Sequence, residues 1–375
     1  MSSQMNTDAK GILSGIRVIE FAGIGPAPFA AMMLADQGAD VIRIDRPDAP
    51  VYGDPALDQL NRGKRSILLD LKTPDGIETA LQLIATAGVL IEGYRPNVME
   101  RLGLAPAICL ARNPKLVYGR MTGWGQSGSM AARPGHDLNY LALTGALHAI
   151  GTTESGPVPP LNLVADFGGG GMMLAYGVIT ALLHVQRGGA GQVVDAAMID
   201  GVACMMAMVY SYKSMGLWAN TPASNLLDGA APQYRTYQCK DKRWVAVAPL
   251  EPSFFRRFLD TLRIDAHHYG DPQDQTLWPA QHEQLKQVFA ARPRDTWAEE
   301  FQDLDACVTP ILDLDEAPRH RHNVERGTFV PVDGSETHFQ PGISPRFSAQ
   351  PKRKPGRPCL PGEHTHEILA ELRAC

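Results

Sequence analysis

Two short segments of the chain carry side chains that could move a proton. Residues 135–140 read GHDLNY and place His136 beside Asp137, directly after a Pro-Gly turn. Asp166 ends an apolar run and stands two residues before four consecutive glycines. Histidine titrates near neutral pH, so it can take up a proton or give one back. An aspartate at a helix start can simply cap that helix, or it can lie beside free N–H groups that hold a developing oxyanion. The residue types leave both interpretations of Asp166 open.

Basic residues gather in the first hundred positions, where an anionic ligand could be held. They are Arg43, Arg46, Arg62, Lys64, Arg65, Lys72 and Arg95. Several follow predicted strand ends, which is where open α/β sheets bind ligands. A run of charges usually forms a solvated surface. The phosphates of a nucleotide-like ligand are the functional alternative.

Two further patterns resemble cofactor sites but are incomplete. Gly23 and Gly25 follow a strand and Asp45 lies 20 residues beyond Gly25, as in a dinucleotide-binding turn. Pro28 stands where the third glycine of that turn belongs, so we do not expect a nicotinamide cofactor. The His-x-His pairs at 320/322 and 364/366 lack companion ligands at helical spacing, and the six cysteines form no C-x-x-C pair, so we expect no metal site.

The elements that must position these residues alternate along the first part of the chain. Apolar segments predict strands at 18–21, 40–45, 66–69, 89–91 and 116–118, with helices at about 29–37 and 74–87. Strands separated by helices of this length indicate a parallel sheet with helical crossovers. The predicted fold class is therefore α/β, with a Rossmann-like large domain at 1–200. Residues 201–225 are expected to form a linker helix, and 226–329 a smaller α+β domain with a hairpin at 234–247.

The composition fits an ordered globular protein of two domains. Of 375 residues, 44% are apolar and 20% are charged, and the formal net charge of −5 excludes the overall basic character of a dedicated nucleic-acid binder. Residues 167–186 contain no Asp, Glu, Lys or Arg and approach the length of a membrane span. Because this stretch carries four glycines, Thr180 and His184, we expect a buried core helix and no membrane contact. The polar N-terminus and the scattered cysteines predict a cytoplasmic protein.

Several motifs in register give the chain a family resemblance from about Leu13 to Leu372. They are GHDLNY at 135–140, PLNLVADF at 160–167, GQVVDA at 191–196, LDGAAP at 227–232, the pair Glu251-Pro252, DACVTP at 305–310 and GEHT at 362–365. The sequence resembles the family III CoA-transferase superfamily, and within it the branch of the α-methylacyl-CoA racemases.

This resemblance implies a CoA thioester as substrate and no separate cofactor, because CoA is part of the substrate. It also implies an interlocked homodimer, a role in fatty acid and lipid metabolism, and a large domain completed by the C-terminal segment 330–375. The residues expected to contact the CoA thioester are Arg46, Leu69, Asp70, Leu71, Lys72, Tyr94, Arg95, Gly135, Asp137 and Tyr140.

The resemblance further implies a proton transfer at the carbon next to the thioester carbonyl. His136 and Asp166 match the two bases that exchange this proton on opposite faces of an enolate. Glu251 matches the carboxylate that partners the histidine, as in hydrolytic triads. Backbone N–H groups at the helix start near Asp166 are expected to stabilise the enolate oxygen.

Two alternatives remain within this resemblance. In a CoA transferase of the same family, the residue matching Asp166 attacks the thioester as a nucleophile. His136 favours the racemase, because transferases generally lack a histidine there, and 228–232 read DGAAP where formyl-CoA transferase-like members have a polyglycine loop. A non-catalytic acyl-CoA binder is a weaker alternative, since binding alone needs no pair of proton-transfer groups. The sequence leaves the preferred acyl chain open.

Overall fold

The structure, a computed structural model, describes residues 11–50, 53–332, 335–350 and 352–374. Contacts divide the described residues into two compact units. Unit 1 holds those within 1–144, 160–206 and 322–375, and unit 2 holds 145–159 and 207–321. Residues 145–159, which the prediction placed in the large domain, thus belong to unit 2, where His148 lies 3.3 Å from the carbonyl oxygen of Asn220.

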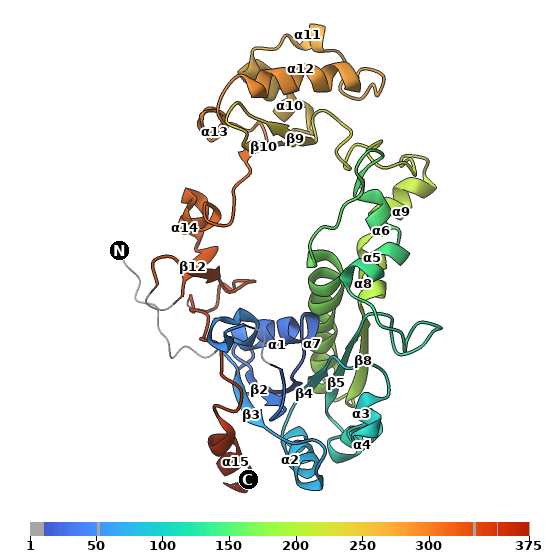
Figure 1. Cartoon of the computed structure of the whole chain (residues 1–375), viewed down its shortest axis with the longest axis vertical. Coiled ribbons are helices and arrows are strands. Elements are labelled where there is room, and N and C mark those ends of the chain that lie inside the picture. Colours follow the sequence, from blue (N-terminus) through green and yellow to red (C-terminus); the bar gives the residue numbers. More distant parts are fainter. Residues whose placement is uncertain (1–10, 51–52, 333–334, 351, 375) are drawn as a thin grey trace. The chain divides into compact units, whose positions relative to one another are not determined.

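Unit 1 is built around a six-stranded sheet in the order β3-β2-β1-β4-β5-β8 (Figure 1). Its strands are β1 (Arg17–Phe21), β2 (Asp40–Asp45), β3 (Arg65–Leu68), β4 (Val89–Glu92), β5 (Val117–Thr122) and β8 (Gln192–Ala197). All neighbouring pairs run parallel. The predicted α/β class with a parallel central sheet is confirmed, and all strand carboxyl ends therefore lie along one edge of the sheet.

Helices cover both faces of this sheet (Figure 1). On one face lie α1 (Pro26–Asp36) and α7 (Met173–Gln186); on the other lie α2 (Pro74–Ala85), α4 (Pro106–Arg112) and α15 (Thr365–Ala374). Thr73 caps α2 through its side chain and Pro74 takes the first helical position, as the sequence predicts. Ile368 of α15 is buried in the same core cluster as Ile67 and Tyr118, so the end of the chain completes unit 1.

The long apolar helix of unit 1 is buried along one side only. A π-helical segment, η3 (Leu163–Met172), continues directly into α7. Residues 163–186 are long and apolar enough to cross a membrane by length and composition. The expected buried core helix is buried only in part, because α7 packs against β5 and β8 on one side and leaves its outer side uncovered. Met172, Tyr176, Ile179 and Leu183 form an exposed stripe there, with exposed fractions of 47%, 71%, 39% and 54%.

Unit 2 has a three-stranded antiparallel sheet in the order β11-β10-β9 with helices packed against it. The elements are β9 (Arg235–Gln238), β10 (Trp244–Val247), β11 (Val308–Pro310), α10 (Pro252–Leu262), α11 (Ala266–Tyr269), α12 (Trp278–Ala290) and α13 (Arg294–Phe301). The predicted hairpin at 234–247 is confirmed as β9 and β10. The core of unit 2 is aromatic, with Phe289 stacked on Tyr237 at 5.1 Å between ring centroids.

Shorter elements complete the chain. They are the helices α3 (Val98–Arg101), α5 (Asp137–Leu143), α6 (Ala146–Ala149), α8 (Met198–Met205), α9 (Ala207–Ser214) and α14 (Arg321–Arg326), the strands β6 (Gly151–Thr152), β7 (Gly156–Pro157), β12 (Phe329–Pro331) and β13 (Phe339–Pro341), and the 3₁₀ turns η1 (Pro55–Leu57), η2 (Gln59–Asn61) and η4 (Ala317–Arg319). The β12–β13 hairpin and the following arm are fixed to unit 1 by the buried Arg62, which donates to the Asp36 carboxylate at 2.6 Å and to the Pro341 carbonyl at 2.7 Å.

Candidate active site

A pocket of about 510 Å³ opens in unit 1 at the carboxyl ends of the parallel strands. Its wall includes 24–27 after β1, 93–96 after β4 and 121–124 at the end of β5, together with His136 and Asp166. Open parallel sheets bind ligands at this edge, because the loops that follow neighbouring strands converge there. The pocket thus brings together the two residues that the sequence predicts to exchange a proton.

His136 is held by its backbone and leaves its imidazole at the pocket wall. It is the N-cap residue directly before α5, and its N–H donates to Asn139 Oδ1 at 3.0 Å. Its carbonyl accepts the N–H of Asn139 at 2.8 Å. The side chain is exposed and lines the pocket. Neither backbone polar group of His136 is thus free to move away from the helix start.

Asp137, the next residue, joins the two chain segments that carry the predicted bases. Its buried carboxylate oxygen Oδ2 accepts the N–H groups of Ala165 and Asp166, both at 2.8 Å. The expectation that N–H groups near Asp166 stabilise an enolate oxygen is therefore wrong for these two groups, because Asp137 already occupies them. Asp137 lies behind the pocket wall, where its carboxylate fixes the start of η3.

Asp166 is half-buried, and its surroundings favour the protonated form more than water does. Burial is the main cause that raises the pKa of its carboxyl group, and the negative charge of Asp137 raises it further. Asn162 Nδ2 donates to Oδ2 at 3.1 Å, which opposes this shift, as does His136. Gly25 passes close by in a left-handed conformation at φ 75°, and a Cβ there would lie 3.6 Å from Oδ2. A carboxyl group with a raised pKa is suited to accept and return a proton.

The structure separates the predicted basic cluster into paired and unpaired cations. Lys64 forms a fully buried ion pair with Glu20 at 2.6 Å, and Arg62 binds Asp36. Arg43 pairs with Asp45, and Arg65 with Asp40 and two glutamates of α15. Lys72 lies 3.8 Å from Asp48 on the surface. Within the described part of the chain, Arg46 and Arg95 have no ion pair or side-chain hydrogen bond.

The remaining predicted CoA contacts lie along the same sheet edge. Arg46 follows β2, 69–72 follow β3, and Tyr94 and Arg95 follow β4. The side chains of Leu69 and Leu71 are buried in the core of unit 1, so only their backbones can meet a ligand. Asp70 and Lys72 are exposed, while Tyr94 and Arg95 line the pocket with His136.

Other predicted residues have different positions. Gly135 and Tyr140 line the pocket, and the Tyr140 hydroxyl donates to the Gly135 carbonyl. Glu251 is exposed at the start of α10 in unit 2, so its partnership with His136 stays a prediction. Asp45 is buried, where it accepts from the Ser66 hydroxyl at 2.7 Å and is not free to bind a ribose.

Sequence reasoning missed two pocket residues, Trp124 and Arg133. Both lie on the loop between β5 and α5, and Arg133 has no side-chain partner among the described residues. The only sequence signal for them was their position shortly before the GHDLNY motif. The described residues contain no group of three or more His, Cys, Asp or Glu side chains that could hold a metal ion. His364 has a structural contact, since its Nδ1 accepts the Ser66 N–H at 3.2 Å.

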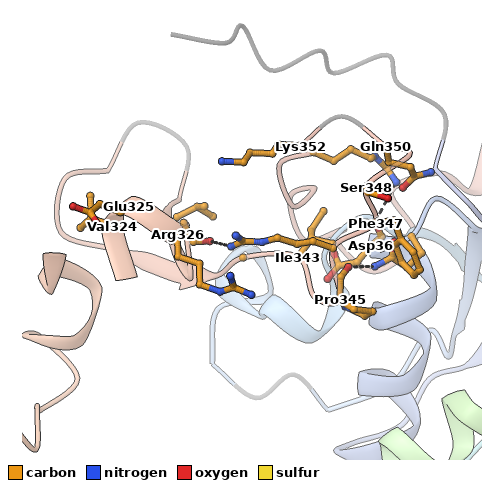
Figure 2. A pocket seen from close by; sticks show the side chains of 16 residues that line it. Asp36, Val324, Glu325, Arg326, Ile343, Pro345, Phe347, Ser348, Gln350 and Lys352 are labelled. Atoms are coloured by element: carbon orange, nitrogen blue, oxygen red, sulfur yellow. Dashed lines mark hydrogen bonds between the residues drawn. The ribbon is translucent and has the colours of Figure 1, made fainter. Parts of the chain in front are cut away.

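A second pocket of unit 1, of about 620 Å³, lies between the end of α1, α14 and the C-terminal arm (Figure 2). Its wall carries four cationic side chains, those of Arg326, Arg346, Lys352 and Arg353. Arg346 donates to the Gly327 carbonyl at 2.9 Å, and Arg353 to the Asp36 carbonyl at 3.1 Å. This wall has no histidine, so it lacks the histidine–carboxylate pair found in the first pocket.

Comparison with known proteins finds relatives that match nearly the whole chain. An alpha-methylacyl-CoA racemase of Mus musculus is 42% identical over 365 residues, covering 96% of this chain and 93% of that protein. The Homo sapiens alpha-methylacyl-CoA racemase is 41% identical with the same coverage of 96% and 93%. A crystal structure of a CaiB/BaiF family protein from Brucella suis aligns with a TM-score of 0.83 at 25% identity, over 97% of this chain and 100% of that chain.

The family follows from these matches. Residues 13–365, which include the sheet, the pocket and both predicted bases, match the family model described as CoA-transferase family III. This chain belongs to CoA-transferase family III.

Proposed function

We propose that this protein is an isomerase that interconverts the 2R and 2S forms of 2-methylacyl-CoA thioesters. The observation that carries the proposal is that His136 and Asp166 line one pocket at the ligand-binding edge of the sheet. The relatives that are 42% and 41% identical over 96% of the chain, both named as racemases, support the same activity.

The chemistry follows from what each side chain can do. Loss of the α-hydrogen as a proton leaves an enolate whose oxygen carries the negative charge. One base removes the proton from one face, and the second base supplies a proton to the opposite face. In the reverse direction the two exchange roles, so each must work both as acid and as base. Imidazole meets this need near neutral pH, and the raised pKa of Asp166 brings its carboxyl group closer to the same range.

The CoA part of the substrate is assigned to the sheet edge beside the pocket. Arg95 lines the pocket and Arg46 follows the neighbouring strand β2, and both guanidinium groups are unpaired within the described residues. Arginine binds phosphate through charge-assisted hydrogen bonds. This assignment uses the backbone of 69–72, since the leucine side chains there belong to the core.

The proposal includes a second copy of the chain and a role for Glu251. The exposed apolar stripe at positions 172, 176, 179 and 183, at the end of η3 and along α7, is a surface that soluble monomers rarely leave uncovered. A second copy that buries this stripe is consistent with the predicted homodimer.

Glu251 would orient His136 and stabilise its charged form.

Replacing either base removes one half of the exchange. We expect His136→Gln and Asp166→Asn each to lower the rate of racemisation by about 10²- to 10⁴-fold, the usual contribution of general acid–base groups. Chiral analysis of a 2-methylacyl-CoA measures this rate, and circular dichroism checks the fold. His366→Gln and Asp75→Asn, at exposed positions on α15 and α2, are the matched controls.

The same variants separate this proposal from the transferase alternative. A transferase with Asp166 as nucleophile would move CoA to an added carboxylic acid, lose this activity in Asp166→Asn and keep it in His136→Gln. That pattern, without racemisation by the wild type, would overturn the proposal.

The charge of Asp137 gives the reaction a predictable pH dependence. Because Asp137 raises the pKa of Asp166, Asp137→Asn is expected to lower it, while the amide oxygen can still accept the two N–H groups. For the enantiomer that Asp166 deprotonates, the acid limb of the kcat/KM profile then moves to lower pH. For the other enantiomer, where Asp166 must be protonated, the basic limb moves to lower pH. If the limbs of the kcat/KM profile of Asp137→Asn lie at the same pH as those of the control Asp75→Asn for both enantiomers, Asp166 is not one of the two bases.

The two unpaired arginines are expected to hold the CoA phosphates. Arg46→Ala and Arg95→Ala should each weaken binding of a 2,2-dimethylacyl-CoA, which has no α-hydrogen, by roughly 1.5–3 kcal/mol, the usual value for a hydrogen bond to a charged group. Isothermal titration calorimetry measures the affinity. Arg112→Ala, which removes an exposed partner of Glu78, is the control. Wild-type affinity in both variants would exclude these side chains from the CoA site.

A further inference from the structure

The aromatic ring of Tyr140 occupies a tight space directly beneath the loop that leads to His136. Only 6% of Tyr140 is exposed. A Cβ on Gly123 would lie 2.0 Å from Tyr140 Cζ, and a Cβ on Gly135 would lie 2.8 Å from Tyr140 Cε1. Both positions therefore require glycine, and the ring fits between the end of β5 and the segment just before α5.

Two aromatic side chains bind consecutive carbonyl groups of that segment. The Tyr140 hydroxyl donates to the carbonyl of Gly135, and Trp124 Nε1 lies 3.5 Å from the carbonyl of Pro134. The two rings also pack edge-on, with centroids 4.7 Å apart and planes at 82°. Here the buried Tyr140 and the partly buried Trp124 both satisfy their polar atoms on the peptide groups that precede His136.

These contacts restrict His136 from its N-terminal side, in addition to the α5 contacts on its own backbone. The Gly135 carbonyl belongs to the peptide group whose N–H is that of His136, and this N–H donates to Asn139 Oδ1 at 3.0 Å. Both ends of one peptide group are thus fixed, which leaves only the side-chain torsions of His136 to vary. Asp166 is fixed by a different group, the Asp137 carboxylate.

We infer that Tyr140 is a positioning residue that acts on His136 through the Gly135 peptide group, a contact separate from the Asp137 contact that fixes Asp166. This inference rests on the proposed racemase function and deepens it. The Tyr140 hydroxyl is used by the protein itself, and its effect on the reaction passes through the peptide group before the imidazole. Small displacements of a catalytic group lower rates strongly, by on the order of 10²-fold for about 1 Å.

The test compares Tyr140→Phe with Tyr118→Phe. Tyr118 provides a matched control, because its buried hydroxyl donates to the Leu104 carbonyl at 3.0 Å in the same unit but outside the pocket wall. Each enantiomer of a 2-methylacyl-CoA is incubated in D₂O with each variant. Initial exchange of the α-hydrogen is followed by NMR, and kcat and KM are measured for both directions. The α C–H bond breaks with its electron pair passing into the enolate, the proton goes to one base, and a deuteron from solvent returns.

His136→Gln first identifies the enantiomer whose exchange needs His136. For that enantiomer, Tyr140→Phe should lower α-hydrogen exchange by roughly 10- to 100-fold. Racemisation uses both bases in each direction, so kcat/KM should fall by the same factor in both directions, through kcat and with KM within about twofold. Exchange of the other enantiomer, which starts at Asp166, should stay within about threefold of the wild type, as should both enantiomers in Tyr118→Phe. Trp124→Phe, which keeps a ring and loses the Nε1 donor, should give the same one-sided loss to a smaller extent.

Three results would overturn the inference. The first is that Tyr140→Phe loses α-hydrogen exchange equally for both enantiomers. The second is that it loses exchange for neither enantiomer. The third is that Tyr118→Phe loses exchange to the same extent as Tyr140→Phe. Failure of the proposed function has a different signature, because the wild-type protein would then exchange neither enantiomer.

Discussion

One buried carboxylate oxygen determines the geometry of the candidate site. Asp137 Oδ2 accepts the N–H groups of both Ala165 and Asp166, and so ties the start of η3 to the start of α5. His136 is the residue immediately before Asp137, so this oxygen sets how far apart the two predicted bases can lie. The same charge raises the pKa of Asp166, which means that one group both positions a base and tunes it. Behind it, η3 continues into α7 on the sheet, which gives the site a rigid support.

The charged side chains of the sheet also fall into two groups, those paired inside the protein and those available to a ligand. Desolvation raises the pKa of Glu20 and lowers that of Lys64, yet the two form a direct ion pair at 2.6 Å in the core. Removal of either partner would leave the charge of the other buried and uncompensated. This ion pair therefore serves the stability of the core and is not available to a ligand. Arg46 and Arg95 follow strands of the same sheet without such partners among the described residues. Among the described residues of this edge, the cations available to a ligand are therefore these two guanidinium groups, the exposed Lys72 and Arg133 of the pocket wall.

The sequence predicted the parallel sheet because strands and helices alternate along the chain, and it singled out His136 and Asp166 by residue type before a family resemblance gave them their roles as bases. It could not predict that Asp137 occupies the N–H groups of Ala165 and Asp166, because that contact joins residues almost thirty positions apart. The basic cluster looked uniform in sequence, since most of the acidic partners are distant in the chain and come from β1, β2, α1 and α15. The exposed stripe at Tyr176 and Leu183 could not be predicted either. Composition indicates that the helix is apolar, but it does not indicate which side of the helix packs on the sheet. Trp124 and Arg133 carried no motif of their own.

The central claim is that the pocket exchanges an α-proton between two faces of a thioester enolate. Its most direct test is incubation of the wild-type protein with a single enantiomer of a 2-methylacyl-CoA in D₂O, with no carboxylic acid added. NMR follows the α-hydrogen and chiral analysis follows the configuration. We expect deuterium at the α-carbon together with conversion toward a mixture of the two epimers. Retention of both the hydrogen and the configuration, followed by transfer of CoA once a free acid is supplied, would contradict it.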